Sequence, residues 1–239
     1  MHLLVCFALK EEAAPFRKMV AGTVAAAQAA SILITGIGRK NAEKSVREFL
    51  ADFSGGASVL ASRRRYTLTR QARLVSSLAP PELVLTCGFT GGLNPDLKLG
   101  DVVFELSTLN SQLSTRLSAS GAKPAKFFCA DRIATTVAEK KKLRVETGAD
   151  AVEMESEAIQ AICRERGIPC ATVRVISDTA NEDLPLDFNR LFKPDMSLDY
   201  GKLAWAIARS PGKIGALLKL QKQTRFAAEG LADTLSKLL

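Results

Sequence analysis

The stretch "AVEMESEAIQAICRERGIPCATVRVISDTA", residues 151–180, decides the fold class of this chain. Its middle part predicts a helix over residues 155–167, because apolar residues recur three and four positions apart and Gly167 follows as a stop signal. After Pro169, residues 170–178 form an apolar run typical of a strand that is buried on both faces. A helix followed at once by a buried strand indicates an α/β fold.

Outward from this stretch, short apolar runs alternate with helical patterns along the chain. Strands that alternate with helices predict a three-layer α/β sandwich around a central mixed β-sheet. The predicted strand regions are residues 3–9, 31–38 and 81–104, the last with a glycine-rich loop inside it, and the further helices are residues 41–53 and 135–148.

This pattern divides the chain into a main domain and two less regular segments. We expect residues 1–183 to form the α/β domain. Within it, residues 54–80 contain Gly-Gly, three consecutive arginines and Pro-Pro, and are predicted to be an insertion or a long loop. Residues 184–239 are predicted to be an appended helical extension, interrupted at Pro211-Gly212.

The composition excludes several kinds of site. The 239 residues include one histidine, His2, and five cysteines, an odd number without a C-x-x-C pair. A disulfide framework, a zinc site and histidine-based catalysis are therefore not expected, and the cysteines indicate a reducing compartment. Acid–base chemistry must then come from carboxylates, and we predict no metal and no organic cofactor.

The net charge and the N-terminal sequence indicate which partners and which cellular compartment to expect. The net charge is +8, but aromatic residues make up only 6% and the common nucleic-acid-binding motifs are missing, so we do not expect a nucleic-acid partner. No apolar run approaches the length of a transmembrane helix, and the N-terminus lacks the features of a signal peptide. We predict a cytoplasmic protein.

Ionisable residues occur where the pattern predicts buried ends of strands. Glu153 and Glu155 lie in a mostly apolar stretch before a helix, where they can stabilise the helix N-terminus or belong to a site. Arg174 falls inside a buried strand, and a buried guanidinium requires carboxylate partners. Asp178 and Glu12 follow the ends of strands. Together they predict a polar pocket at one edge of the sheet.

Two glycine-containing turns differ in what they indicate. "TGIGRKNA" (35–42) lacks the third glycine of a dinucleotide-binding fingerprint and is interpreted as a structural turn. "TCGFTGGL" (86–93) follows an apolar strand, and its glycines, Gly88 first, would let a ligand approach backbone N–H groups. A plain structural turn is the alternative at this position.

Four stretches carry a resemblance to the nucleoside phosphorylase and nucleosidase superfamily. The chain resembles most closely the methylthioadenosine/adenosylhomocysteine nucleosidases and the hopanoid-associated phosphorylase branch. The resemblance covers most of residues 1–53 and 81–182, and V-E-M-E followed by V-R-x-I-S-D is its most specific part. The stretches are "FALKEEAAPF" (7–16), "TGIGRKNAE" (35–43), "GFTGGLNPDLKLGDVV" (88–103) and residues 151–180.

This resemblance implies a purine nucleosidase, which hydrolyses an N-glycosidic bond. Glu12 would orient and activate the attacking water, and Asp178 would protonate the purine at N7 while Ser177 holds Asp178 in place. A general acid in this position contributes roughly 10²–10⁴-fold to the rate.

The same resemblance assigns the sugar-binding residues. Met154 would lie under the ribose, and Glu155 would bind its 2′- and 3′-hydroxyls. Arg174 would balance the carboxylates near the water, and Glu153 of the V-E-M-E motif is grouped with the substrate-binding residues. A carboxylate beside the sugar also favours the positive charge that develops on it.

The chain departs from the family pattern at three positions. Thr86 and Phe89 stand where phosphorylases of the superfamily hold phosphate with an arginine and with a serine or threonine. Water is therefore the expected nucleophile, and a phosphate-dependent phosphorylase is the alternative. Ile133 stands near the position of an aromatic residue that stacks on the base, so stacking would be weaker or would come from Phe89.

The C-terminal region bears on the substrate and the partners. The hopanoid-associated branch is thought to remove adenine from adenosylhopane, so a lipid-linked nucleoside and a methylthioadenosine-type nucleoside are both candidate substrates. Lysines interleaved with apolar residues after residue 200 suit a membrane surface, whereas ordinary packing on the domain explains them equally well. The family implies a homo-oligomer, a dimer or a larger assembly. The non-enzymatic alternative is a nucleoside-binding protein that retains the fold.

Overall fold

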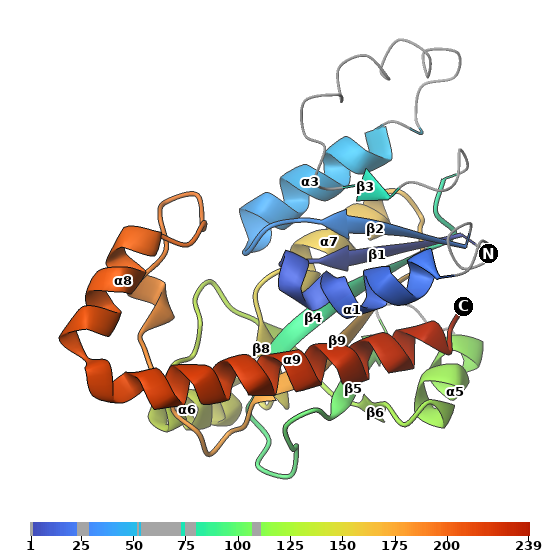
Figure 1. Cartoon of the computed structure of the whole chain (residues 1–239). Coiled ribbons are helices and arrows are strands. Elements are labelled where there is room, and N and C mark those ends of the chain that lie inside the picture. Colours follow the sequence, from blue (N-terminus) through green and yellow to red (C-terminus); the bar gives the residue numbers. More distant parts are fainter. Residues whose placement is uncertain (1, 23–28, 52, 54–72, 75–79, 107–110) are drawn as a thin grey trace.

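The computed structural model describes residues 2–22, 29–51, 53, 73–74, 80–106 and 111–239. Within these residues, nine strands form one mixed sheet at the centre of the molecule (Figure 1). The strands are β1 (Leu3–Phe7), β2 (Ala30–Ile34), β3 (Arg73–Leu74), β4 (Leu83–Gly92), β5 (Val102–Leu106), β6 (Lys123–Pro124), β7 (Phe127–Cys129), β8 (Ala151–Glu153) and β9 (Cys170–Asp178).

The strand order along the sheet is β3-β2-β1-β4-β9-β5-β6. β2, β1, β4 and β9 are mutually parallel, while β5 runs antiparallel to β9. β8 pairs with the last residues of β4, and β7 pairs with β8, so these two short strands extend the sheet beside the end of β4. The carboxyl ends of the four parallel strands therefore meet at one edge, where open α/β sheets bind ligands.

Helices cover both faces of the sheet (Figure 1). α1, α5 and α9 contribute to the core on one face, and α3 and α7 contribute to the core on the other. The helices are α1 (Lys10–Ala21), α3 (Arg39–Ala51), α5 (Ser111–Ala119), α6 (Val137–Thr147), α7 (Ser156–Glu165), α8 (Tyr200–Arg209) and α9 (Ile214–Ser236), with short 3₁₀ turns η2 (Phe188–Arg190) and η3 (Pro211–Lys213).

The alternation of side chains along β1 explains the two cores. Leu3, Val5 and Phe7 face the layer of α1 and α9, whereas Leu4 and Cys6 face the layer of α3 and α7. Because both faces are covered, β1 contains no polar residue, as expected for a parallel strand buried between helices. The predicted sandwich with a central mixed sheet is confirmed.

Two sequence-based expectations need revision. The glycine-rich segment 88–92 is the last part of strand β4 rather than a loop, because the glycines leave room for side chains that pack against the strand. The C-terminal extension contains α8 and α9 with a break at η3, as predicted. The second half of α9, however, contributes Ala227, Leu231 and Leu235 to the main core. The domain boundary near residue 183 stays a prediction, and most of the predicted insertion lies outside the described residues.

Candidate active site

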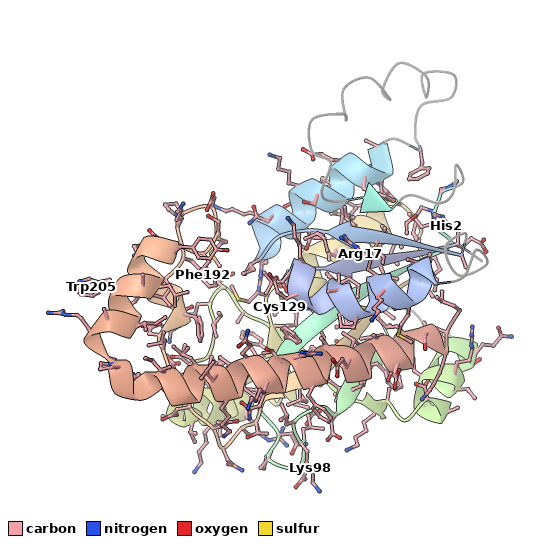
Figure 2. The ribbon with its side chains drawn as sticks, in the orientation of Figure 1. His2, Arg17, Lys98, Cys129, Phe192 and Trp205 are labelled. Carbon is pink, nitrogen blue, oxygen red and sulfur yellow. The ribbon has the colours of Figure 1, made fainter. Side chains whose placement is uncertain are left out.

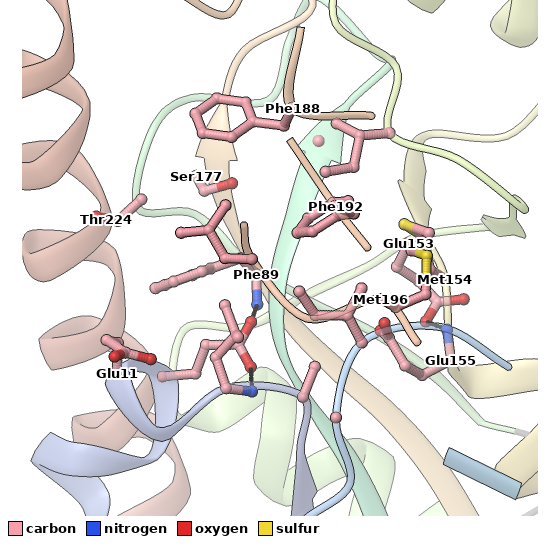
Figure 3. A pocket seen from close by; sticks show the side chains of 18 of the residues that line it. Glu11, Phe89, Glu153, Met154, Glu155, Ser177, Phe188, Phe192, Met196 and Thr224 are labelled. Carbon is pink, nitrogen blue, oxygen red and sulfur yellow. Dashed lines mark hydrogen bonds between the residues drawn. The ribbon is translucent and has the colours of Figure 1, made fainter. Parts of the chain in front are cut away.

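A pocket of about 740 Å³ opens at the carboxyl ends of the parallel strands (Figure 3). Its walls come from the ends of β1, β2, β4 and β9, from the start of α1, and from β8 and the residues before α7. The segment after β9, as far as the first half of α9, completes them. This volume is in the range of pockets that enclose a small organic ligand. Of the ten residues predicted from the sequence, eight line it: Glu12, Phe89, Ile133, Glu153, Met154, Glu155, Ser177 and Asp178.

Glu12 reaches the pocket from the first turn of α1. Its carboxylate accepts hydrogen bonds from the backbone N–H of Leu9 (2.9 Å) and of Phe89 (2.8 Å), which tie α1 to β4. A Cβ atom on Gly88 would lie 2.7 Å from the Glu12 carboxylate, so only glycine leaves room for it. Gly88 is not among the residues that line the pocket, and its contact with a ligand stays a prediction.

Burial sets the protonation of Glu12. Removal from water raises the pKa of Glu12 to about 7, although Arg174 and the backbone N–H of Phe89 oppose this shift. A carboxyl group that titrates near neutrality is suited to accept a proton from water.

Arg174 projects from the middle of β9 behind the pocket wall and forms ion pairs with two carboxylates. Its Nη2 atom lies 2.7 Å from Glu153 and 3.2 Å from Glu155, and it donates to the hydroxyl of Thr86 at 3.1 Å. Arg174 is 1% exposed, and these contacts replace part of the water that its guanidinium has lost, since its Nε atom is buried without a partner among the described residues. Glu12, Glu153 and Glu155 give this site more negative than positive charge.

Glu153 and Glu155 differ in what they hold. The Glu153 carboxylate accepts the backbone N–H groups of Glu155 and Ser156 and the hydroxyl of Ser156. It therefore fixes the start of α7 and orients Arg174. Glu155 accepts a hydrogen bond from the backbone N–H of Gly38 at 2.8 Å, and burial raises its pKa. Glu155 lines the pocket beside Met154, so its carboxylate can meet a ligand there.

Asp178 is the last residue of β9 and also lines the pocket. The hydroxyl of Ser177 donates to its Oδ1 atom at 2.8 Å. The ammonium of Lys140, from α6, lies 2.6 Å from its Oδ2 atom. Both carboxylate oxygens therefore have a fixed partner, of which the sequence predicted only Ser177.

Apolar side chains close the rest of the pocket. Figure 3 shows Phe188, Phe192 and Met196 around the cavity that Phe89 and Met154 also line. Ile133, at the position discussed for base stacking, is fixed through its backbone: its N–H donates to Asn189, whose side-chain amide donates back to its carbonyl. Besides Phe89, three aromatic residues line the pocket, namely Phe188, Phe192 and Tyr200, so the pocket does not depend on Ile133 for stacking.

Sequence reasoning missed Lys140, Phe188, Phe192 and Met196. Lys140 is the first of three consecutive lysines, a run that ordinarily indicates a solvated face. Phe188 and Phe192 are four residues apart in "DFNRLF", a spacing that places two side chains on the same face of a helix. They nevertheless lie in a turn and an irregular segment rather than in a regular helix.

Comparisons with known proteins agree with the predicted resemblance. A sequence model of the phosphorylase superfamily matches residues 119–208. The 5'-methylthioadenosine/S-adenosylhomocysteine nucleosidase of Shewanella halifaxensis is 24% identical over 178 residues, 59% of this chain and 77% of its own. The aminodeoxyfutalosine nucleosidase of Campylobacter jejuni is 32% identical over 107 residues, 43% of each chain.

Solved structures match over almost the whole chain. The futalosine hydrolase of Helicobacter pylori has a TM-score of 0.62 at 15% identity, covering 100% of this chain and 97% of its own. The 5'-methylthioadenosine/S-adenosylhomocysteine nucleosidase of Neisseria meningitidis, in complex with methylthio-immucillin-A, has a TM-score of 0.64 at 16% identity, covering 99% and 97%. At such identities the likeness establishes a shared fold.

Proposed function

We propose that this chain, a member of the phosphorylase superfamily, is a nucleosidase that hydrolyses the N-glycosidic bond of purine nucleosides. The observation that carries the proposal is the meeting of Glu12, Glu155 and Asp178 around one pocket, each held by hydrogen bonds that fix its carboxylate. The named relatives are nucleosidases, which supports the same reaction class.

Glu12 serves as the base that activates water. With a pKa of about 7, its carboxylate can take a proton as the water oxygen bonds to C1′ of the sugar. Its two backbone donors, on Leu9 and Phe89, hold the carboxylate in one orientation.

Asp178 serves as the acid for the leaving purine. The bond from C1′ to the base breaks with its electron pair staying on the purine, and a proton that Asp178 has taken from solvent passes to N7. Glu155 holds the ribose hydroxyls above Met154, and the excess of carboxylates over Arg174 stabilises positive charge on the sugar. Proton exchange with solvent then restores both carboxyl groups.

Cleavage is expected to need no phosphate. Thr86 is fully buried and accepts a hydrogen bond from Arg174, so neither residue is free to bind an anion at the phosphorylase position. The test incubates adenine nucleosides with the protein, with and without phosphate, and identifies the products by mass spectrometry. We expect equal rates and free sugar. Accumulation of sugar 1-phosphate would reject hydrolysis in favour of phosphorolysis, and tight binding without any base release would favour a binding protein.

We further propose that the substrate carries a large apolar group at its 5′ position, as a lipid-linked nucleoside does. Besides Met196, the C-terminal region contributes Leu198, Tyr200 and Leu220 to the lining of the pocket. Tyr200 lines the pocket and is also 77% exposed, so the apolar lining continues to the surface at α8. A substituent that is longer than the pocket would leave at this point.

The surface next to this exit suits a membrane. Trp205, Ile214 and Leu218 are 61%, 44% and 54% exposed, and Figure 2 shows Trp205 pointing away from the molecule on α8. Lys213 and Lys222 are exposed on the same segment. No helix in the described part of the chain is long and apolar enough to cross a bilayer. We propose peripheral contact with anionic lipid, and a cytoplasmic dimer remains a prediction from the resemblance.

The double change Lys213→Glu and Lys222→Glu is expected to weaken binding to anionic vesicles by at least roughly tenfold, since each basic residue near such a surface contributes about 1 kcal/mol. Co-sedimentation with phosphatidylcholine vesicles, with and without phosphatidylglycerol, at low and high salt measures this. Point substitutions are used instead of a truncation of the C-terminal region, because a truncation would remove core residues of α9.

The matched control is Lys40→Glu with Lys44→Glu, which makes the same charge change at exposed positions of α3. This control should bind vesicles as the parent protein does. Equal weakening by both double variants would mean that net charge alone is responsible, and no binding by the parent protein would remove the membrane proposal.

A further inference from the structure

Lys140 is buried in the part of the protein that holds the acid, although its neighbours in sequence are exposed. Its side chain is 0% exposed, whereas Lys141 and Lys142 face solvent on the same helix. An ammonium group is rarely buried without a function or a full set of partners. Here all three N–H donors are used: Asp178 Oδ2 at 2.6 Å, the carbonyl of Thr179 at 2.7 Å and the carbonyl of Glu182 at 2.8 Å.

The helix that carries Lys140 is fixed relative to the end of β9. Thr136 caps α6, and its capping box with Glu139 sets where the helix begins. The backbone N–H of Val137 donates to the side chain of Asp183, and the backbone N–H of Leu184 donates to the carbonyl of Thr135. α6 is thus bound to the residues that follow Asp178. Its position fixes Lys140 next to the Asp178 carboxylate.

We propose that Lys140 is a positioning residue, which orients the Asp178 carboxyl group for proton transfer to the leaving purine. This inference rests on the proposed nucleosidase function. With Ser177 on Oδ1 and Lys140 on Oδ2, the carboxyl group cannot rotate about its bond to Cβ. When the proton passes to N7, the carboxylate left on Asp178 is stabilised by the ammonium beside it.

The turn after Asp178 extends this arrangement to α9. The carboxylate of Glu182 is bound by Lys219 at 2.6 Å and also accepts from Gln223, while the backbone carbonyl of Glu182 accepts from Lys140. The turn to which the Lys140 ammonium donates is therefore itself fixed in place. A reacting group is oriented only when the residues that support it are held in this way.

The test compares two leaving groups in Lys140→Met, which keeps the length of the side chain but has neither charge nor donors. For adenosine, whose base needs a proton to leave, we expect kcat to fall roughly 30- to 100-fold, within the range of general-acid effects. For p-nitrophenyl riboside, whose leaving group departs as a stable anion, we expect a change of less than about threefold. KM should change little for either substrate, since Lys140 does not line the pocket.

Lys141→Met, an equal loss of charge at an exposed position of the same helix, is the control. Active-site concentrations are set by titration with a C-nucleoside analogue of adenosine, so a variant that folds incompletely is still measured correctly. An equal fall in kcat for both leaving groups would overturn the inference, because it would indicate general damage to the site. No fall for adenosine would overturn it as well.

A second comparison uses Asp178→Asn with and without Lys140→Met. If Lys140 acts through Asp178, its removal from the Asp178→Asn protein should leave the residual turnover of adenosine unchanged. A further loss of the same size as in the parent protein would overturn the inference. If the parent protein cleaves neither substrate, the nucleosidase function itself fails, which distinguishes that result from an active protein that is insensitive to Lys140→Met.

Discussion

Replacing Asp178 by asparagine is expected to lower kcat for purine nucleosides by roughly 10²–10⁴-fold while ligand binding survives. The amide cannot deliver a proton to N7, but it fits the site. The amide oxygen can accept a hydrogen bond from Lys140, and the amide nitrogen can donate one to the hydroxyl of Ser177. These are the two residues that the Asp178 carboxylate contacts in the parent protein. The loss should therefore appear in turnover and not in folding. Steady-state kinetics with adenosine, and the dissociation constant of a C-nucleoside analogue, measure the two quantities.

The control for this change is Asp96→Asn, an exposed aspartate in the loop after β4. Its turnover should equal that of the parent protein. If Asp178→Asn retains turnover within a few-fold of the parent, Asp178 is not the general acid, and proton donation must be assigned to another group or to solvent.

The sequence predicted the parts of this site that lie at the ends of regular elements. Glu12, Glu155 and Asp178 lie within a few residues of apolar runs, and the sheet edge that those runs predict brings them together. The buried Arg174 was also predictable, because an arginine inside a run of nine buried residues has to meet carboxylates.

The parts that escaped prediction depend on tertiary packing. The buried state of Lys140 comes from the docking of α6 against the turn at residues 179–184, which helical periodicity does not show. Phe188 and Phe192 reach the pocket from an irregular segment whose path has no sequence period. The close approach of Gly88 to Glu12 could not be predicted for the same reason, since the two residues are 76 positions apart along the chain.

The structure also changes the role of the C-terminal region. The sequence presented it as an extension with two interpretations, packing or membrane contact. Ala227, Leu231 and Leu235 pack into the core, while Trp205 and Leu218 remain exposed. The two interpretations therefore apply to different parts of the region: the second half of α9 is packed, and only the segment from α8 to the first half of α9 is available for a surface contact.

Replacing Arg174 by methionine is expected to lower the free energy of unfolding at neutral pH by about 3–5 kcal/mol, because it leaves buried carboxylates without their cation. Glu153 and Glu155 both contact the guanidinium, and the positive charge of Arg174 also lowers the pKa of Glu12. The pKa of Glu12 and of Glu155 is already raised by burial, and loss of the positive charge should raise both further. A carboxyl group whose folded pKa lies above its unfolded value destabilises the fold as the pH rises through that interval. The deficit should therefore be larger at pH 8 than at pH 5.

Urea denaturation at several pH values measures this deficit, and Arg47→Met is the matched control. Arg47 makes two hydrogen bonds with Glu165, at 2.7 and 2.9 Å, but both side chains are about half exposed. Water screens such a pair, so its loss should lower the free energy of unfolding far less than Arg174→Met does, and the effect should depend little on pH between 5 and 8. A similar, pH-independent deficit in both variants would mean that Arg174 contributes through packing of its side chain, and the charge balance proposed for the site would then have to come from other groups.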